Sequence, residues 1–259
     1  MLAAIAPTIP RAALVTGGAR RLGRALALAL AGAGFAVALH YRDSREEAEA
    51  CGAEMSRLGV GVALLRADLD HEAETATLLG RATAALGPIG VLVNNASRFE
   101  RDEWDSVTRA SWDAHIEPNL RAPFVLMQDF ARALPEHAEG VVLNLLDQRV
   151  FSPTPHFVSY TVSKFGLWAL TQSMALALAP RIRVAAIGPG PTLPSARQTQ
   201  AQFVHQNRSV PLQHGTSPEE VAEAALAILR LRSFTGQMLA LDGGQHLQWS
   251  PAAPAIFEE

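Results

Sequence analysis

Three residues in the middle of the chain have the types and the spacing needed for proton transfer: Asp147, Tyr160 and Lys164. Tyr160 and Lys164 are four positions apart, so on a helix their side chains share one face, one turn from each other. An ammonium group beside a phenol stabilises the phenolate, which lowers the pKa of the phenol from its ordinary value of about 10. The pair therefore predicts that Tyr160 acts as a proton donor near neutral pH.

Asp147 follows an apolar run, residues 140–146, and precedes Tyr160 by thirteen positions. An ionised carboxylate here would repel the oxyanion that develops on a ketone, but it would accept hydrogen bonds from N–H groups. Together with a tyrosine, it could also pass a proton to a ring nitrogen. Asp147 thus favours a nitrogen-containing substrate over a simple ketone. The alternative is that Asp147 only caps the loop after the apolar run.

A glycine-rich segment, residues 16–23, stands between an apolar run and a helical pattern. In that position backbone N–H groups and a helix N-terminus bind the pyrophosphate of a dinucleotide. Gly17 permits the tight turn, and Gly23 lets the helix approach the strand closely. A positive charge at a helix start is unfavourable, so Arg21 indicates a bound anion. The residues predicted to bind the cofactor here are Gly17, Arg20, Arg21, Leu22 and Gly23.

The second apolar run ends in the residues Leu39-His40-Tyr41-Arg42-Asp43-Ser44. An NAD-dependent enzyme places an acid at the end of this strand, to bind the ribose hydroxyls. The position assigned to that acid is Tyr41, and guanidinium groups are the preferred partners of a 2′-phosphate. NADP is therefore predicted, while Asp43 supports the alternative, NAD. The residues predicted around the adenosine ribose are Arg20, His40, Tyr41, Arg42 and Ser44.

Short apolar runs alternate with helical patterns along the whole chain. The predicted strands are residues 12–16, 35–41, 61–66, 89–94, 140–146, 183–187 and 238–241, and the predicted helices are 24–33, 45–58, 73–86, 112–134 and 159–179. The strands are apolar on both faces, which is typical of a parallel sheet covered by helices on both sides. The alternation predicts a doubly wound α/β Rossmann fold with seven parallel strands. We expect one domain over residues 1–259, with an irregular substrate lid at about 188–215.

The composition excludes several classes of protein. The chain has 259 residues, 49% hydrophobic and 18% charged, with a net charge of −3. A nucleic-acid or anionic-membrane partner would require a basic patch, which this balance does not favour. The single cysteine, Cys51, permits no intrachain disulfide. No signal peptide, membrane span or metal site is predicted, and the expected location is the cytoplasm.

The combined motifs resemble those of the short-chain dehydrogenase/reductase family. They are the glycine-rich turn, Asn94-Asn95-Ala96-Ser97, Tyr160 with Lys164, Gly188-Pro189-Gly190 and Asp242-Gly243-Gly244. The chain departs from the family pattern at Arg21 and Ser97, where glycine is usual, and at Asp147, where serine is usual. The resemblance implies that Tyr160 donates the proton, that Lys164 also holds the nicotinamide ribose, and that Asn119 orders a water molecule. It further implies cofactor contacts from Asp68, Leu69, Asn95, Ala96, Ser97, Tyr160, Lys164, Pro189 and Gly190.

Within that family, the chain resembles the pteridine reductase and dihydromonapterin reductase subgroup. The shared features are residues 20–23, His40-Tyr41, residues 95–99 and an aspartate in place of the serine. This resemblance implies that Phe99 stacks on a pterin ring and that Ser97 forms a hydrogen bond with it. Arg21 would contact both the cofactor phosphate and the substrate, beside Asp147 and Tyr160. The predicted function is NADPH-dependent reduction of a pterin or dihydropterin.

Two alternatives of different kinds remain open. One is a carbonyl reductase of the same family, acting on 3-oxoacyl thioesters or small ketones. The other is a non-catalytic protein that senses NADP, which the combination of Tyr160, Lys164 and Asn119 disfavours.

The family resemblance also implies a homotetramer, and residues 112–134 and 158–179 are apolar on more than one face. The apolar tail, residues 247–251, is expected to reach a neighbouring active site. The further pocket candidates are His156, Phe157 and Trp249.

Overall fold

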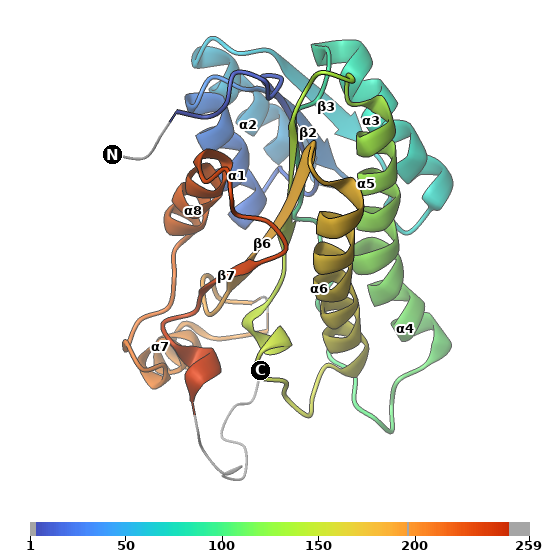
Figure 1. Ribbon diagram of the computed structural model, residues 1–259. Coiled ribbons are helices and arrows are strands. Elements are labelled where there is room, and N and C mark those ends of the chain that lie inside the picture. The colour runs from blue at the N-terminus through green and yellow to red at the C-terminus, as the bar shows by residue number, and fades with distance from the viewer. Residues whose placement is uncertain (1–3, 196, 249–259) are drawn as a thin grey trace.

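The computed structural model describes residues 4–195 and 197–248. A central sheet of seven parallel strands lies between two layers of helices (Figure 1). The strands are β1 (Ala12–Val15), β2 (Ala36–Tyr41), β3 (Val62–Arg66), β4 (Val91–Asn94), β5 (Gly140–Leu145), β6 (Ile182–Pro189) and β7 (Met238–Leu241). Their order is β3-β2-β1-β4-β5-β6-β7, so the chain winds outward in both directions from β1. The predicted doubly wound fold is confirmed.

The helices divide between the two faces of the sheet. They are α1 (Arg21–Gly32), α2 (Arg45–Arg57), α3 (Glu72–Leu86), α4 (Arg109–Ile116), α5 (Ala122–Ala133), α6 (Val158–Leu178), α7 (Gln200–Ser209) and α8 (Pro218–Arg230). Helices α1, α2 and α8 cover one face, and α3, α5 and α6 cover the other (Figure 1). Both faces of the sheet are therefore buried.

Strand β1 shows why the sequence pattern of the strands is apolar throughout. Ala13 and Val15 belong to the core under α1 and α8, whereas Ala12 and Leu14 belong to the core under α3 and α5. All four side chains are buried, so polar alternation has no place in this strand. Burial of a side chain the size of Leu14 stabilises the fold by about 1.5–3 kcal/mol.

The predicted single helix over residues 112–134 is broken into three parts. Helix α4 is followed by a π-helical turn, Glu117–Arg121, and then by α5. Pro118 and Pro123 are the second residues of the second and third parts, and each lacks the N–H that would continue an α-helical ladder. The local widening lies at Asn119, one of the predicted site residues.

The segment 188–215 was expected to be irregular, and this expectation is wrong in part. Helix α7 occupies residues 200–209, where Thr199 and Gln202 form a reciprocal capping box. Helix α8 was not predicted at all, although the sequence carries its start signal. Ser217 accepts a hydrogen bond from the N–H of Glu220 over 3.1 Å, and Pro218 occupies the first turn.

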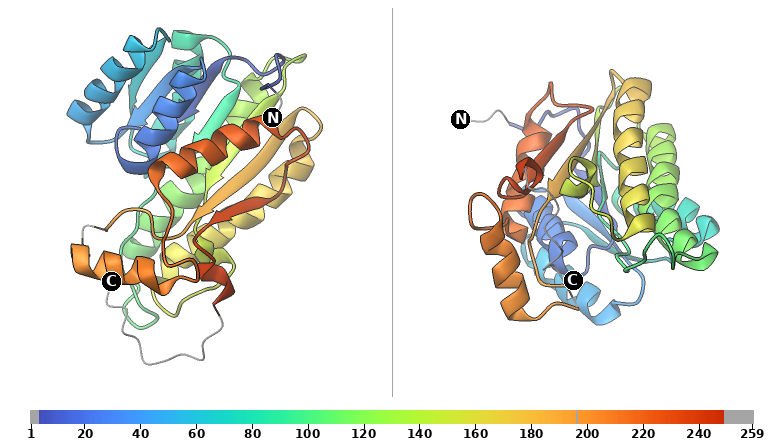
Figure 2. Two further views of the ribbon diagram at one scale, coloured as in Figure 1. Left: turned by 90° about the vertical axis from the view of Figure 1, so that its left-hand side faces the viewer. Right: turned by 90° about the horizontal axis from the view of Figure 1, so that it is seen from below.

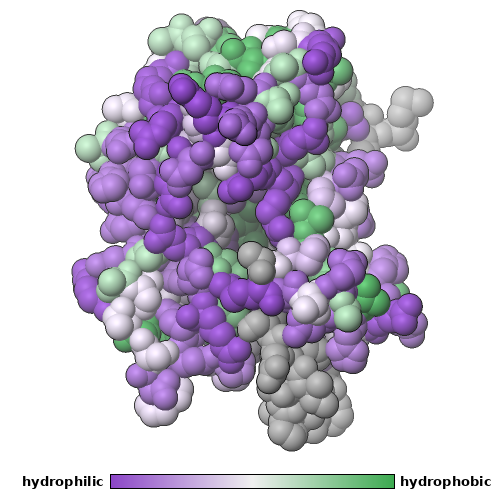
Figure 3. Space-filling model, turned by 180° about the vertical axis from the view of Figure 1, so that it is seen from behind, coloured by the Kyte–Doolittle hydropathy of each residue, from purple (hydrophilic) through white to green (hydrophobic). Residues whose placement is uncertain are grey.

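The loops that follow the strands gather at one edge of the sheet, where α7 also lies (Figure 2). Seen from behind, the surface is largely hydrophilic and is hollowed near its middle (Figure 3). Within the described residues, no helix is both long enough and apolar enough to cross a lipid bilayer.

Candidate active site

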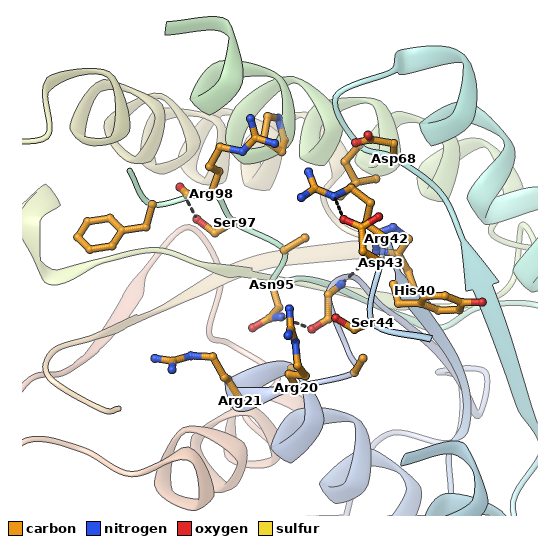
Figure 4. A pocket seen from close by; sticks show the side chains of 18 of the residues that line it. Arg20, Arg21, His40, Arg42, Asp43, Ser44, Asp68, Asn95, Ser97 and Arg98 are labelled. Atoms are coloured by element: carbon orange, nitrogen blue, oxygen red, sulfur yellow. Dashed lines mark hydrogen bonds and ion pairs between the residues drawn. The ribbon is translucent and has the colours of Figure 1, made fainter. Parts of the chain in front are cut away.

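A cavity of about 490 Å³ runs along the carboxyl ends of β1, β2 and β4. Its wall contains every residue predicted for the phosphate and adenosine end of a dinucleotide (Figure 4). They are Gly17, Arg20, Arg21, Leu22, Gly23, His40, Tyr41, Arg42, Ser44, Asp68, Leu69, Asn95, Ala96 and Ser97. Asp70 and Arg98, which the sequence did not single out, also line it and form an ion pair at 2.9 Å.

The glycine-rich turn is fixed from below by His40. The N–H of Gly17, which has a φ of 60°, donates to Nδ1 of His40 over 3.1 Å. The Nε2 of the same ring lies 3.1 Å from the carbonyl of Ala67, so the neutral ring carries its proton on Nε2. Burial lowers the pKa of His40 to about 4, which keeps the ring neutral. His40 therefore positions the turn, because both of its nitrogens are engaged with the backbone.

Gly23 is required by the close approach of α1 to this turn. A Cβ at Gly23 would fall on the carbonyl of Gly17 and on the side-chain amide of Asn95. That amide donates to the carbonyls of Thr16 and Gly17, at 2.9 and 3.1 Å. The turn thus keeps its shape through contacts between β1, β4 and the start of α1.

Arg21 stands in the left-handed region with a φ of 53°, a conformation that favours glycine. Its guanidinium donates to the carbonyls of Pro194 and Leu193, at 3.0 and 3.3 Å. Arg21 therefore ties the glycine-rich turn to the segment after β6. It lines the large cavity and also a second, smaller one.

The end of β2 carries no free acid. Tyr41 is the last residue of the strand and is buried. Arg42 follows, and its Nε donates to Asp43 over 2.7 Å. The hydroxyl of Ser44 makes no capping hydrogen bond with α2. This arrangement fits a 2′-phosphate better than ribose hydroxyls, since Asp43, the first acid after β2, is paired with Arg42.

Asp147 and Tyr160 are in direct contact. The Tyr160 hydroxyl donates to Oδ2 of Asp147 over 2.8 Å. The same carboxylate accepts from the backbone N–H of Arg149 at its Oδ1, over 2.8 Å, and from Nη1 of Arg149 at its Oδ2, over 3.2 Å. Asp147 therefore contacts the expected proton donor and also caps the turn Gln148–Val150. Arg149 was missed in the sequence, where only its place two residues after Asp147 marks it.

Lys164 lies one helical turn after Tyr160 and is buried. Its Nζ donates to the carbonyl of Leu145 over 2.8 Å and lies 5.7 Å from the centroid of the Tyr160 ring. Burial lowers the pKa of Lys164 to about 8, against an opposing effect of the Asp147 carboxylate. Lys164 lines neither the large cavity nor the smaller one beside Tyr160, and its ammonium group packs behind the Tyr160 ring.

Asn119 is held by protein groups. Its Nδ2 donates to the carbonyl of Arg98 and to the hydroxyl of Ser163, at 2.9 and 3.1 Å, and its Oδ1 accepts from the N–H of Arg98 over 2.8 Å. The side-chain amide thus fixes the loop after β4, and its expected role in ordering a water molecule stays a prediction.

Phe99 joins the two cavities. Its ring stacks on Phe157 with centroids 4.5 Å apart and meets the edge of Tyr160 at 4.6 Å. The guanidinium groups of Arg149 and Arg197 lie 5.4 and 5.5 Å from the same ring. Phe157, a pocket candidate, supports Phe99 from behind.

The smaller cavity has a volume of about 230 Å³ and lies between Tyr160 and the lid segment. Arg21, Leu22 and Phe99 line both cavities, so the two adjoin. The predicted residues Asp147, Tyr160, Pro189 and Gly190 line the smaller one, together with four amide side chains, Gln148, Gln198, Gln206 and Gln245. His156 pairs instead with Glu103 over 2.8 Å. Trp249 lies outside the described residues.

The start of α6 is capped from a distant segment. Phe157 precedes the helix with a φ of 58° and offers no side-chain acceptor. Asp102 supplies the missing acceptors. Its Oδ1 accepts from the N–H of Ser159 over 3.1 Å, and its Oδ2 accepts from the Ser159 hydroxyl. The main-chain carbonyl of Asp102 accepts from the N–H of Phe157 over 2.9 Å. The turn that carries Tyr160 is thereby fastened to the loop that carries Phe99. No pattern in the sequence pointed to Asp102.

The family model for short chain dehydrogenases matches residues 11–204. The chain belongs to the short-chain dehydrogenase family. The matched range contains the glycine-rich turn, Asn119, Asp147, Tyr160 and Lys164, and most of the lid segment.

Solved structures extend this finding. FolM alternative dihydrofolate reductase 1 from Brucella canis, in complex with NADP, is 43% identical, with a TM-score of 0.92, and the match covers 96% of this chain and 100% of that one. The protein of the same name from Brucella suis, also in complex with NADP, is 45% identical, with a TM-score of 0.90 and coverages of 92% and 96%. The 3-oxoacyl-acyl-carrier-protein reductase FabG of Staphylococcus aureus is 29% identical over 242 residues, 92% of this chain and 98% of that protein.

Proposed function

We propose that this short-chain dehydrogenase is an NADPH-dependent reductase of a pterin or dihydropterin. The observation that carries the proposal is the hydrogen bond from Tyr160 to Asp147, 2.8 Å long, at the mouth of a polar cavity. A carboxylate beside the proton donor suits a substrate with N–H groups. The likeness to the two FolM structures supports the same reading.

The residues of the large cavity fit a nicotinamide dinucleotide phosphate. Gly17 and Gly23 let α1 pack closely on the turn, since a Cβ at either position would meet backbone or side-chain atoms of the protein. The pyrophosphate would bind at the start of α1, beside this turn. Arg20, Arg42 and Ser44 would hold the 2′-phosphate at the far end. When bound, NADPH supplies a hydride to the substrate carbon.

The protein's own groups would deliver the accompanying proton. Reduction of a C=N bond needs a hydride on carbon and a proton on nitrogen, and the Tyr160 hydroxyl is the donor that faces the smaller cavity. The Lys164 ammonium, 5.7 Å from the Tyr160 ring centroid, stabilises the phenolate left behind. Asp147 orients the Tyr160 hydroxyl and accepts hydrogen bonds from substrate N–H groups.

The side chains that line the smaller cavity favour a pterin over a fatty acyl chain as the substrate. Amide, hydroxyl and charged side chains account for most of its side-chain wall, including the four glutamines and Thr192. An acyl chain gains affinity from apolar walls, whereas a pterin edge gains it from paired donors and acceptors. Phe99 offers an aromatic surface for a flat ring at the junction of the two cavities.

A carbonyl reductase of 3-oxoacyl thioesters is the second candidate. It is favoured by the likeness to FabG along nearly the whole chain. The two candidates differ in what they require at position 147, because a serine serves a ketone oxygen and a carboxylate opposes the oxyanion.

The test is NADPH oxidation with dihydrobiopterin, dihydromonapterin, dihydrofolate and an acetoacetyl thioester, run on the wild type and on Asp147→Ser. We expect turnover of at least one pterin and a loss of about 100-fold or more in kcat/KM for it in Asp147→Ser, on the scale of a lost general acid–base contribution. Turnover of the thioester alone, retained or improved in Asp147→Ser, would establish the carbonyl reductase instead.

We also propose that the protein assembles as a homotetramer. The outer face of α6 exposes apolar side chains in the single chain, with Val162, Phe165 and Leu176 at 40%, 38% and 84% of full exposure. Sedimentation equilibrium measures the assembly directly, and a monomer at micromolar concentration refutes the proposal.

A further inference from the structure

Asp147 and Arg149 form the most buried arginine–carboxylate pair among the residues that the structure describes. Nη1 of Arg149 lies 3.2 Å from Oδ2 of Asp147, and the two side chains are 14% and 15% exposed. In every other such pair between described residues, both side chains are at least 25% exposed. Solvent and salt therefore screen this pair less than the others.

A carboxylate at this depth needs a partner of opposite charge. The same oxygen, Oδ2, also accepts from the Tyr160 hydroxyl over 2.8 Å. When Tyr160 gives its proton to the substrate nitrogen, its O–H bond breaks and a phenolate remains beside Asp147. Two negative oxygens would then face each other, which is unfavourable unless cations stand next to them. Arg149 supplies a cation at Oδ2, while the Lys164 ammonium lies behind the Tyr160 ring.

Further contacts fix the guanidinium of Arg149 in place. Its Cζ lies 5.4 Å from the ring centroid of Phe99 and 5.3 Å from that of Phe157, within the range of cation–π attraction. The two rings stack on each other and Phe157 is buried, so Arg149 packs against well-held neighbours. The backbone N–H of Arg149 donates to Oδ1 of Asp147 over 2.8 Å. The side chain of Arg149 thus holds one carboxylate oxygen, and its main chain holds the other.

We propose that Arg149 is a positioning residue, whose guanidinium keeps the Asp147 carboxylate turned toward Tyr160 and compensates its charge. This deepens the proposed reduction and rests on it, because Tyr160 is the proton donor there and Asp147 accepts from substrate N–H groups. Arg149 is then effective only while position 147 carries a carboxylate. That dependence distinguishes it from a residue that merely stabilises the fold.

The experiment is a double-mutant cycle in which Arg149→Met is made in the wild type and in Asp147→Asn. The measured quantities are kcat/KM for a dihydropterin and, without turnover, the dissociation constant of the oxidised pterin in the presence of NADP. In the wild type, Arg149→Met should worsen both by about tenfold, the size of one lost charged hydrogen bond. In Asp147→Asn, the same change should worsen them by less than about twofold. The affinity for NADPH should be unchanged, because Arg149 does not line the large cavity.

Arg149→Lys returns a positive charge to Oδ2 and should recover most of the loss. Arg197→Met is the matched control. The guanidinium of Arg197 also lies beside the Phe99 ring, at 5.5 Å, but it pairs with Glu100 over 2.8 Å. Any loss that Arg197→Met causes should be the same factor with and without the carboxylate at position 147.

Equal losses from Arg149→Met in the two backgrounds overturn the inference and leave the proposed function standing. Arg149→Gln, which keeps a hydrogen-bond donor and removes the charge, repeats the cycle if the methionine variant does not fold, and the same equality overturns the inference. Failure of the wild type to bind or reduce any pterin overturns the proposed function, and the inference falls with it.

Discussion

The Tyr160 hydroxyl donates to Oδ2 of Asp147 over 2.8 Å, while Arg149 holds both oxygens of that carboxylate from the other side. Tyr160, the proposed proton donor, and Asp147 are therefore one hydrogen-bonded unit. Lys164 acts on this unit through its charge, with Nζ 5.7 Å from the centroid of the Tyr160 ring. A substitution of Asp147, Tyr160 or Lys164 should therefore change the protonation of the other two.

The pKa of Lys164 predicts an alkaline limit to activity. Burial lowers this pKa to about 8, so the ammonium is present below that pH and is lost above it. We expect kcat/KM for NADPH, which reports ionisations of the free enzyme, to fall as the pH rises through about 8. Stopped-flow or steady-state rates between about pH 6 and 10 measure this fall, the alkaline limb of the pH profile.

The Asp147 carboxylate raises the pKa of Lys164 against the effect of burial. Asp147→Asn should therefore move the alkaline limb to lower pH. Asp105→Asn removes an exposed carboxylate and should leave the limb in place. A limb that stays fixed in Asp147→Asn would show that Lys164 is not the group observed.

The cap from Asp102 predicts a stability effect far from the chemistry. Asp102→Ala leaves the N–H and the hydroxyl of Ser159 without their acceptor, so the free energy of unfolding should fall by about 2 kcal/mol. Because the same cap fixes Phe157 behind Phe99, the KM for substrate should rise as well. Urea unfolding and steady-state kinetics measure the two effects.

Asp102→Asn serves as the conservative comparison, since it keeps one acceptor oxygen, and it should recover most of the lost stability. Asp105→Ala, in the same loop but exposed, should change stability by less than about 0.5 kcal/mol. Equal destabilisation by the alanine changes at 102 and 105 would refute the capping role.

His40 predicts a loss of stability in mild acid. Its pKa is about 4 in the folded protein and about 6.5 when unfolded, so the unfolded chain binds more protons between these values. Stability is full above about pH 6.5 and declines as the pH falls toward 4. From pH 7.5 to pH 5 this one residue should account for about 2 kcal/mol.

The check is urea unfolding at both pH values for the wild type and His40→Gln. The variant should be less stable at pH 7.5 and should lose less stability on acidification. His137→Gln, at an exposed histidine, should keep the wild-type dependence on pH. An unchanged dependence in His40→Gln would contradict the assignment.

The end of β2 predicts cofactor choice. Arg42→Ala and Ser44→Ala should each weaken NADPH binding by about tenfold, because each removes a donor that we propose for the 2′-phosphate. NADH lacks that phosphate, so its affinity should be nearly unchanged. Fluorescence titration with both nucleotides measures the difference, and equal losses for both would place these residues elsewhere on the cofactor.

Local patterns were enough to determine the sheet and the positions of the main site residues. Short apolar runs that alternate with helical patterns are typical of strands of a covered parallel sheet, and parallel strands bring their carboxyl ends to one edge. Gly17, Asn95, Asp147 and Tyr160 follow or adjoin such ends, so their convergence was predictable. The start of α8 is also encoded locally, by Ser217 and Pro218.

Contacts between distant segments were decided only by the tertiary structure. Asp102 caps α6 through Ser159, which lies 57 positions later in the chain, and Arg21 binds carbonyls 172 and 173 positions away. No periodicity encodes such pairs, because they depend on how loops meet after the sheet has formed. The burial that lowers the pKa of Lys164 is likewise a property of the packed molecule. The sequence alone determined the fold and most residues at the carboxyl ends of the strands, because these follow from local patterns. Packing decided the contacts that each of them makes, and it also brought in residues such as Arg149, which no local pattern marks.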